Sequence, residues 1–247
     1  MNKIKIDILM TVHNGERFLE QAIKSLKSQK YRNWQLVIIN NFSTDKTSEI
    51  LNQVKYNLKK IKVFNTHKLY SRPEVLNLGM KHCKNDYIGI LDADDLVSEN
   101  WLKDVKEIII QNKNFGAIVG KCIFINEKNK VFKKKFFFDI NQGPINHMFN
   151  YTFPCAHSGS IFNKKIISKF KKPYDESLKT GHDWRLFLKI SSKNDILFVD
   201  KEWIYWRRYK QSVTAQNQVT SKIDIIKNLL YKKKKILSYS NQLKNNF

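Results

Sequence analysis

Three carboxylates stand within four positions of one another in the segment LDADD, residues 91–95, directly behind an apolar run. Asp92 and Asp94 offer the hard oxygen ligands that Mg²⁺ and Mn²⁺ accept together with phosphate oxygens. Acids in such a turn more often cap a helix or face solvent, and Asp95 in particular could cap the next helix. Because the turn follows a buried strand, the sequence also favours a site for a metal and a phosphate, to be weighed against that ordinary role.

Two other polar segments follow predicted strands in the same way. His13-Asn14-Gly15 comes after the strand predicted at 6–12, and Asn40-Asn41 comes after the strand predicted at 36–39. In open parallel sheets, ligands bind in the crevice beyond the carboxyl ends of the strands. We therefore expect these two segments and the LDADD turn to meet at one edge of a sheet.

The elements that must hold these segments alternate along the first 115 residues. Short runs rich in Ile, Leu and Val predict buried strands at 6–12, 36–39, 61–64 and 87–91. Amphipathic spacing and start signals predict helices at 16–29, 46–58, 73–83 and 99–112. Strands that alternate with helices predict an α/β fold with a mainly parallel sheet.

From about residue 117 the strict alternation ends. Further strands are predicted at 117–125, 130–138, 196–199 and 203–208, with a loop-rich stretch at 141–160 and a helix at 182–192. A basic helix and a polar tail follow from about residue 220. The sequence has neither an internal repeat nor a linker rich in Pro, Gly or Ser, so we predict one domain with a C-terminal appendage.

Several motifs occur in order between residues 8 and 95. An apolar strand ends in His13-Asn14, the exit of the next helix matches S-x-x-x-Q-x-Y at 25–31, and the second strand runs into Phe42-Ser43-Thr44-Asp45. Asn77-Leu78-Gly79 and the LDADD turn follow. These motifs resemble the inverting family-two glycosyltransferases of the glycosyltransferase-A fold, in which the third motif reads Gly-Ser-Thr-Asp. Weaker similarities in GHDW and YWRR extend the resemblance over residues 5–214.

The resemblance implies a Rossmann-like, mainly parallel central sheet flanked by helices, with a smaller mixed sheet on the acceptor side. It implies a catalytic domain at residues 1–215, with a donor-binding half at about 1–115 and an acceptor half at about 116–215. A basic helical tail would occupy residues 216–247.

The resemblance also implies roles for single residues. Asp92 and Asp94 would hold Mn²⁺ or Mg²⁺ against the diphosphate of a nucleotide sugar, with UDP as the favoured nucleotide. Asp183 would be the catalytic base that takes the proton of the acceptor hydroxyl, unless it is an ordinary acid stabilised by the dipole of its helix. The residues that would bind the donor are Thr11, His13, Asn14, Glu16, Asn40, Asn41, Arg72, Asp92, Ala93 and Arg207.

The sequence departs from the family pattern at several positions. Members usually carry two acids where this chain has Asn40 and Asn41, and an amide adds no negative charge, so the choice of base is open. The residue before Asp183 is often Glu and here is His182, which could bind substrate, tune the base or pack. Many members have a His at the position of Tyr209.

Three further features have two interpretations each. The aromatic residues at 203–209 could offer a stacking face for a sugar, although an alternating aromatic strand is more often part of the core. His157 falls where the family usually lines the acceptor side, but an ordinary loop residue is the better prediction. Arg72 could reach phosphate or be solvated like most isolated arginines.

The chain is strongly basic, with 45 Lys and Arg against 22 Asp and Glu. This charge indicates an anionic partner without choosing between nucleic acid, an acidic membrane and a phosphorylated ligand. The amphipathic tail with its Lys block at 232–235 fits a surface on anionic lipid and an exposed tail equally well. No motif typical of nucleic-acid binding is present, so we expect no nucleic-acid partner.

Other features of the sequence bear on location. Three widely spaced cysteines outside any CxxC pattern favour a reducing cytoplasm over a disulfide framework or a zinc site. The first ten residues predict neither a signal peptide nor a membrane span, and no later run is apolar enough to cross a membrane.

Together these features predict a metal-dependent inverting glycosyltransferase that moves a sugar from a nucleotide sugar to the hydroxyl of a glycan or lipid-linked glycan. Bacterial surface polysaccharide or lipopolysaccharide synthesis is the expected setting, in the cytoplasm or at the inner face of the plasma membrane. The alternatives are an inactive relative that only binds sugar nucleotides and a basic nucleic-acid-binding protein.

Overall fold

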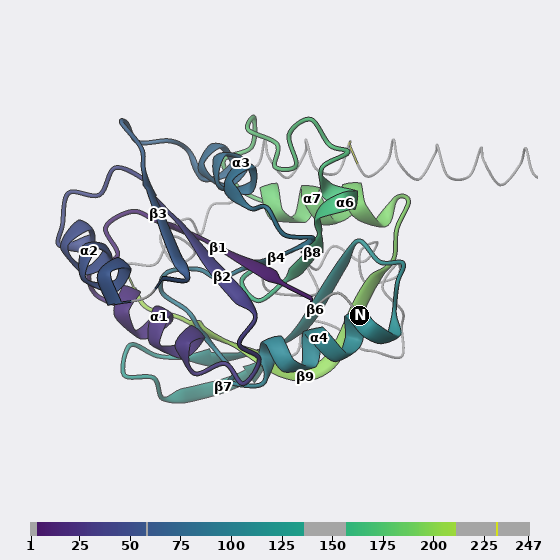
Figure 1. The fold of residues 1–247 in the computed structure, drawn as a ribbon, viewed down its shortest axis with the longest axis horizontal. Helices are drawn as coiled ribbons and strands as arrows, with labels where there is room; N and C mark the ends of the chain where they lie inside the picture. Colours follow the sequence, from purple (N-terminus) through teal and green to yellow (C-terminus); the bar gives the residue numbers. More distant parts are fainter. Residues whose placement is uncertain (1–3, 58, 136–156, 211–230, 232–247) are drawn as a thin grey trace, which may run out of the picture.

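The computed structural model describes residues 4–57, 59–135, 157–210 and 231, and a nine-stranded sheet runs through its centre (Figure 1). The strands are β1 (Ile6–Val12), β2 (Trp34–Asn40), β3 (Ile61–Asn65), β4 (Tyr87–Ile90), β5 (Leu96–Val97), β6 (Ala117–Ile125), β7 (Val131–Lys135), β8 (Ile161–Asn163) and β9 (Ile196–Arg207). The helices are α1 (Leu19–Lys27), α2 (Thr47–Asn57), α3 (Arg72–His82), α4 (Trp101–Gln111), α6 (Lys164–Ile167) and α7 (His182–Ser191).

The N-terminal half of the sheet is parallel. β1 lies between β2 and β4, and β3 continues the parallel order beyond β2. All seven residues of β1 are buried, as expected for a strand covered by helices on both faces. The carboxyl ends of these strands therefore lie at one edge of the sheet.

The C-terminal half of the sheet is mixed. β8 is antiparallel to β4 and β6, β9 is parallel to β6, and the short β5 pairs antiparallel with β9. The predicted α/β architecture is confirmed, but the smaller mixed sheet that was predicted is not separate, because its strands join the parallel strands in one sheet (Figure 1). The division into two halves and a tail stays a prediction.

Helices cover both faces of the sheet. α1, α2 and α4 bury their apolar residues in one core cluster, whereas α3, α6 and α7 bury theirs in a second cluster on the opposite face. Figure 1 shows α3, α6 and α7 together in the upper part of the view, apart from α1, α2 and α4. The site is thus built on a sheet supported from both sides.

The sequence did not predict β5, β8 and α6. They have two, three and four residues, too few for a hydrophobic period to show. The two strands predicted at 196–199 and 203–208 are one strand, β9, whose register on β6 shifts on either side of Lys121. The predicted stretch 136–138, most of the loop at 141–160 and the tail except Tyr231 lie outside the described residues.

Within the described residues, no helix combines the length and the apolar character that crossing a bilayer requires.

Candidate active site

Asp92 lies two residues after the end of β4 and forms an ion pair with Arg72, the first residue of α3. Arg72 also donates from Nη1 to the hydroxyl of Thr11 on β1, at 3.4 Å. Burial, the largest single effect, would raise the pKa of Asp92, but the charge of Arg72, its hydrogen bond and the nearby His157 together lower that pKa below its ordinary value. Asp92 is therefore ionised at neutral pH, in a position held by three elements.

Local signals start α3 at the point that brings Arg72 to Asp92. Ser71 and Glu74 form a capping box, in which the Glu74 carboxylate accepts from the backbone N–H of Ser71 at 2.9 Å. Gly79 lets the helix lie close to β1, since a Cβ at this residue would stand 2.4 Å from a methyl carbon of Leu9. A larger residue would push α3, and Arg72 with it, away from the sheet.

Asp94 and Asp95 are held by the end of β9. The hydroxyl of Tyr209 donates to Asp94 at 3.2 Å, and the backbone N–H of Arg207 donates to Asp95 at 2.9 Å. Burial and then the neighbouring charge of Asp92 raise the pKa of Asp94. Asp95 is 1% exposed and ties the turn to β9, whereas Ala93 packs against the apolar core.

Arg207 was predicted to contact the diphosphate, but the residue is 1% exposed and its guanidinium is bound to protein acceptors. Nε donates to the carbonyl of Asp94 at 2.7 Å, and Nη1 donates to Asn129 Oδ1 at 2.7 Å and to two carbonyls in the same turn. Nη2 donates to Gln21 at 3.2 Å. Arg207 thus links the LDADD turn to the turn between β6 and β7. This geometry does not support a direct contact between Arg207 and phosphate.

The aromatic residues near Arg207 divide between the core and the site. Trp203 is buried, and its indole donates to Asp104 at 3.0 Å, so this residue belongs to the core. Tyr209 belongs to the site through its bond to Asp94.

The segments after β1 and β2 lie side by side, joined by hydrogen bonds. His13 donates from Nδ1 to the carbonyl of Asn41 at 2.9 Å. Asn14, in the left-handed region with φ 51°, accepts from the backbone N–H of Thr44 at 2.8 Å, and its own N–H donates to Ser43 at 3.0 Å. Two of the three polar segments predicted to meet are therefore in contact.

Glu16 faces a different part of the surface. Its carboxylate accepts from the backbone N–H of Lys46 at 3.0 Å, and its side chain lines a surface hollow with Arg17 and Glu49. This hollow lies between the start of α1 and α2, so the structure does not bring Glu16 to the Asp92 carboxylate.

The two amides at the end of β2 hold neighbouring segments. Asn41 accepts from the backbone N–H of Tyr70 at 3.0 Å and donates to its carbonyl at 2.9 Å, which fixes the chain just before Arg72. Asn40 donates to Asn65 at 3.0 Å and to a serine of α2. The Oδ1 of Asn40 is buried and has no hydrogen-bond partner in the described part of the chain.

Phe42, the next residue, is unusual in two ways. Its φ is 58°, in the left-handed region that disfavours a residue with a Cβ, and 49% of its surface is exposed. The family that the sequence resembles has Gly at the position of Phe42, and Gly adopts this conformation without steric cost.

The start of α7 carries Asp183, the residue predicted to be the catalytic base. Asp183 lies in the first turn, and its Oδ1 accepts from the backbone N–H of Trp184 at 2.8 Å. Nearby, the buried His157 shares a hydrogen bond of 2.8 Å with the hydroxyl of Tyr174, and the ring of Tyr174 meets that of His182 edge-on at 6.1 Å. His157 is thus a buried partner of Tyr174 and not the plain loop residue that was preferred.

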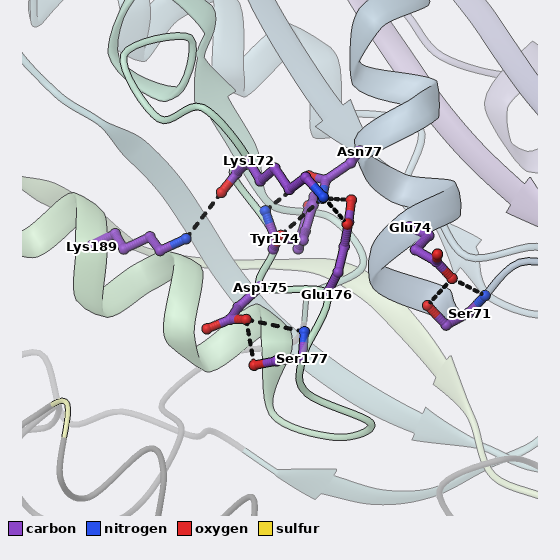
Figure 2. Close-up of polar contacts among 9 residues, drawn as sticks. All are labelled: Ser71, Glu74, Asn77, Lys172, Tyr174, Asp175, Glu176, Ser177 and Lys189. Atoms are coloured by element: carbon purple, nitrogen blue, oxygen red, sulfur yellow. Dashed lines mark hydrogen bonds and ion pairs between the residues drawn. The ribbon is translucent and has the colours of Figure 1, made fainter.

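Asn77 positions Tyr174 across 97 residues of sequence, as Figure 2 shows. Its amide donates to the carbonyl of Tyr174 at 2.8 Å and accepts from the N–H of the same residue at 2.9 Å. A further bond of 3.0 Å reaches Glu176. The helix that carries Arg72 is therefore also the anchor for the loop that leads to α7.

Sequence reasoning missed Tyr174 and Ser158 as members of this site. The hydroxyl of Ser158 accepts from the backbone N–H of Asp92 at 3.2 Å. Gly159, in the left-handed region with φ 82°, lies against Ile204, where a Cβ would stand 1.9 Å from a methyl carbon. The sequence predicted a loop over this stretch, but nothing in it showed that the loop returns to β4.

Comparison with known proteins identifies the family of this chain. The profile described as Glycosyl transferase family 2 matches residues 7–170. The chain belongs to glycosyltransferase family 2. The predicted family membership and the predicted enzyme class, a glycosyltransferase, are thereby confirmed.

Several relatives of this glycosyltransferase carry related names. An uncharacterized glycosyltransferase of Haemophilus influenzae is 36% identical over 45% of this chain and 45% of its own length. One of Rickettsia conorii is 32% identical over 82% of this chain and 32% of its own length, and the minor teichoic acid biosynthesis protein GgaB of Bacillus subtilis is 28% identical over 85% and 24%. The chain spans from a quarter to half of the length of these relatives.

Solved structures show the fold of the glycosyltransferase. Staphylococcus aureus TarS, determined with UDP-GlcNAc, superposes with a TM-score of 0.72 at 17% identity, over 87% of this chain and 62% of the TarS chain. GalNAc-T7, determined with UDP, GalNAc and Mn²⁺, superposes with a TM-score of 0.68 at 16% identity, over 84% and 44%. The predicted glycosyltransferase-A fold is confirmed.

The residues of this glycosyltransferase fit a divalent cation. Asp92 and Asp94 are two carboxylates close enough for the charge of one to raise the pKa of the other, a repulsion that a cation relieves. Within the described residues, no three His, Cys, Asp or Glu side chains converge on a point that could hold a metal.

Proposed function

We propose that the protein is a metal-dependent, inverting glycosyltransferase that takes a sugar from a nucleotide sugar, with UDP as the favoured nucleotide. The observation that carries this proposal is the meeting of Arg72, Thr11 and the Asp92–Asp94 pair at the carboxyl edge of the sheet. The Arg72 guanidinium suits a diphosphate, and the two carboxylates beside it suit a divalent metal ion.

The roles of the residues follow from their chemistry. Arg72 would bind the diphosphate while the amides and backbone of the segments after β1 and β2 receive the nucleoside. A divalent cation bound by Asp92 and Asp94 would neutralise the charge of the departing nucleoside diphosphate. Asp183 would take the proton of the acceptor hydroxyl as its oxygen attacks the anomeric carbon from the face opposite the leaving group, which inverts that centre.

The acceptor that we propose is a hydroxyl of a glycan or a lipid-linked glycan of the bacterial cell surface. The name of the GgaB relative, from teichoic acid biosynthesis, supports a surface polymer, with capsule and lipopolysaccharide as alternatives. We further propose that the enzyme works in the cytoplasm, at the inner face of the plasma membrane, with its basic tail on anionic lipid.

A binding panel tests the donor half of this proposal. Thermal unfolding with UDP, GDP, CDP and their common sugar conjugates, with and without Mn²⁺, ranks the ligands by the stability that they add. We expect UDP compounds to raise the midpoint most, and more with Mn²⁺ than without it. Asp92→Asn should abolish the part that depends on Mn²⁺, and a protein that binds none of these compounds would refute the proposal.

A single substitution tests the catalytic half. Asp183→Asn should bind the best donor as the wild type does but release nucleoside diphosphate at least a hundredfold more slowly when a bacterial glycan extract is supplied, because general-base catalysis typically contributes that much. Full activity in this variant would reject Asp183 as the base. If the wild type binds the donor but never releases nucleotide, an inactive relative that only binds sugar nucleotides is the better description.

A further inference from the structure

His182, next to the candidate base Asp183, has an unused hydrogen-bonding atom. It is the first residue of α7, directly after Gly181, whose φ of 66° turns the chain into the helix. Nδ1 of His182 is buried and has no hydrogen-bond partner among the residues that the structure describes. A buried polar atom without a partner destabilises the fold, so its retention calls for an explanation.

The neighbours of His182 do not use this atom. The ring of Tyr174 meets the imidazole edge-on, and the hydroxyl of Tyr174 is already bonded to His157. Burial, and then the charge of Arg72, lower the pKa of His182 against the opposing effects of Asp183 and Asp92. The imidazole is therefore neutral at physiological pH, with one nitrogen able to donate and the other able to accept.

The position of His182 indicates what its partner would be. It precedes the candidate base Asp183 in the chain, and its charge state responds to Arg72 and Asp92, where the diphosphate is proposed to bind. In the proposed reaction the transferred sugar lies between the diphosphate and the base. A sugar hydroxyl is neutral and both donates and accepts, so it matches a neutral imidazole.

We propose that Nδ1 of His182 hydrogen-bonds a hydroxyl of the sugar that is transferred, so that this histidine helps to select the nucleotide sugar. This inference rests on the proposed function. It goes beyond it by assigning a substrate contact to a position where resembling enzymes often have Glu.

The test separates binding of the sugar from binding of the nucleotide. His182→Phe keeps the size of the ring without its nitrogens, and His182→Asn keeps a polar atom near the place of Nδ1. Dissociation constants for UDP, UDP-glucose, UDP-galactose, UDP-GlcNAc and UDP-GalNAc are measured by calorimetry with Mn²⁺. His82→Phe is the matched control, because His82 lies at the far end of α3 and stacks on Phe64 at 3.8 Å.

We expect His182→Phe to bind the preferred nucleotide sugar at least tenfold more weakly than the wild type while its affinity for UDP changes less than twofold. His182→Asn should recover part of the loss, and His82→Phe should match the wild type. An unchanged ratio between UDP-sugar and UDP affinities in both His182 variants would overturn the inference and leave the proposed function standing. A wild type that binds neither UDP nor any UDP-sugar would overturn both.

If His182→Phe fails to fold, the test uses His182→Asn and compares its relative affinities for different UDP-sugars with those of the wild type. The preference between UDP-GlcNAc and UDP-GalNAc, or between UDP-glucose and UDP-galactose, should change at least threefold in this variant. A preference identical to that of the wild type would overturn the inference.

Discussion

At the scale of single residues, Phe42 adopts a backbone conformation that a residue with a side chain disfavours. A side chain with a Cβ in the left-handed region costs about 1–3 kcal/mol, and this aromatic ring is half exposed, which limits what its contacts can return. We therefore predict that Phe42→Gly raises the free energy of unfolding by up to about 1 kcal/mol, after the greater freedom of Gly in the unfolded chain is subtracted. Urea denaturation measures the change.

Leu69→Gly is the matched control for Phe42→Gly. Leu69 is also an exposed apolar loop residue, but its φ is not positive, so the change relieves no strain and should lower stability slightly. Equal losses in the two variants would show that contacts of the Phe42 ring outweigh its backbone strain.

His157 carries a prediction about pH. Burial lowers its pKa to about 4 in the folded protein, against about 6.5 in an unfolded chain. A histidine with a lowered folded pKa stabilises the fold above the unfolded value, and this stability is lost as the pH falls through 6.5 toward 4. Between pH 7.5 and 4, we expect the wild type to lose up to about 3 kcal/mol more than His157→Gln, which keeps a partner for Tyr174.

Unfolding by urea at a series of pH values checks this difference. The exposed His67 provides the control, because His67→Gln should retain the pH dependence of the wild type. A His157→Gln variant with that same dependence would contradict the prediction.

At the scale of elements, α3 holds the site together at two points. Its first turn carries Arg72, and Asn77, one turn later, clamps the backbone of Tyr174 (Figure 2). Asn77→Ala would leave the N–H and the carbonyl of Tyr174 without partners in a buried place. We predict a loss of about 2–4 kcal/mol in the free energy of unfolding.

Glu74→Gln on the same helix is the control for Asn77→Ala. Gln can replace Glu in a capping box, so this change should cost only a few tenths of a kcal/mol. Denaturation curves for the two variants provide the comparison, and similar small losses would mean that water replaces Asn77 at Tyr174.

The elements also show what a sequence can and cannot reveal. Helices and strands with several turns or alternations were predicted close to their observed bounds, since each repeats its apolar residues often enough to be recognised. The helix predicted at 16–29 begins only at Leu19, because residues 14–16 are bonded to the segment after β2. Pairing of this kind depends on residues about thirty positions away.

At the candidate site, residues at the ends of predicted strands could be found from sequence, and residues from loops could not. Asp92 and Thr11 come together because the ends of parallel strands lie at one edge, a rule that needs no coordinates. Tyr174 and Ser158 reach the site through loops whose course follows no period. The hydrogen bonds of Arg207 to protein acceptors depend on the position of the turn between β6 and β7, so they could not be predicted from the sequence either.

At the scale of the whole molecule, Tyr231 touches the helix that carries the candidate base. Arg185 of α7 lies over the ring of Tyr231, 4.2 Å from its centre. Removal of residues 221–247 should therefore lower stability by about 1 kcal/mol and, if the tail lies on lipid, should also abolish binding to vesicles that contain phosphatidylglycerol. Thermal unfolding and sedimentation with vesicles measure the two effects.

Tyr231→Ala separates these two effects. It removes the contact with Arg185 but leaves the lysines at 232–235, so it should lower stability while vesicle binding persists. Undiminished vesicle binding after removal of the whole tail would contradict a role of the tail at the membrane.

The strand order has a consequence for synthesis on the ribosome. β8 lies between β4 and β6, and β9 completes the sheet beside β6 and β5, so strands made late fill positions next to strands made early. Until residues 161–163 emerge, the backbone groups of β4 that β8 will pair with have no strand beside them, and an unpaired apolar edge invites association with other chains. The nascent chain is therefore expected to need protection by chaperones until nearly all of the sheet has been made.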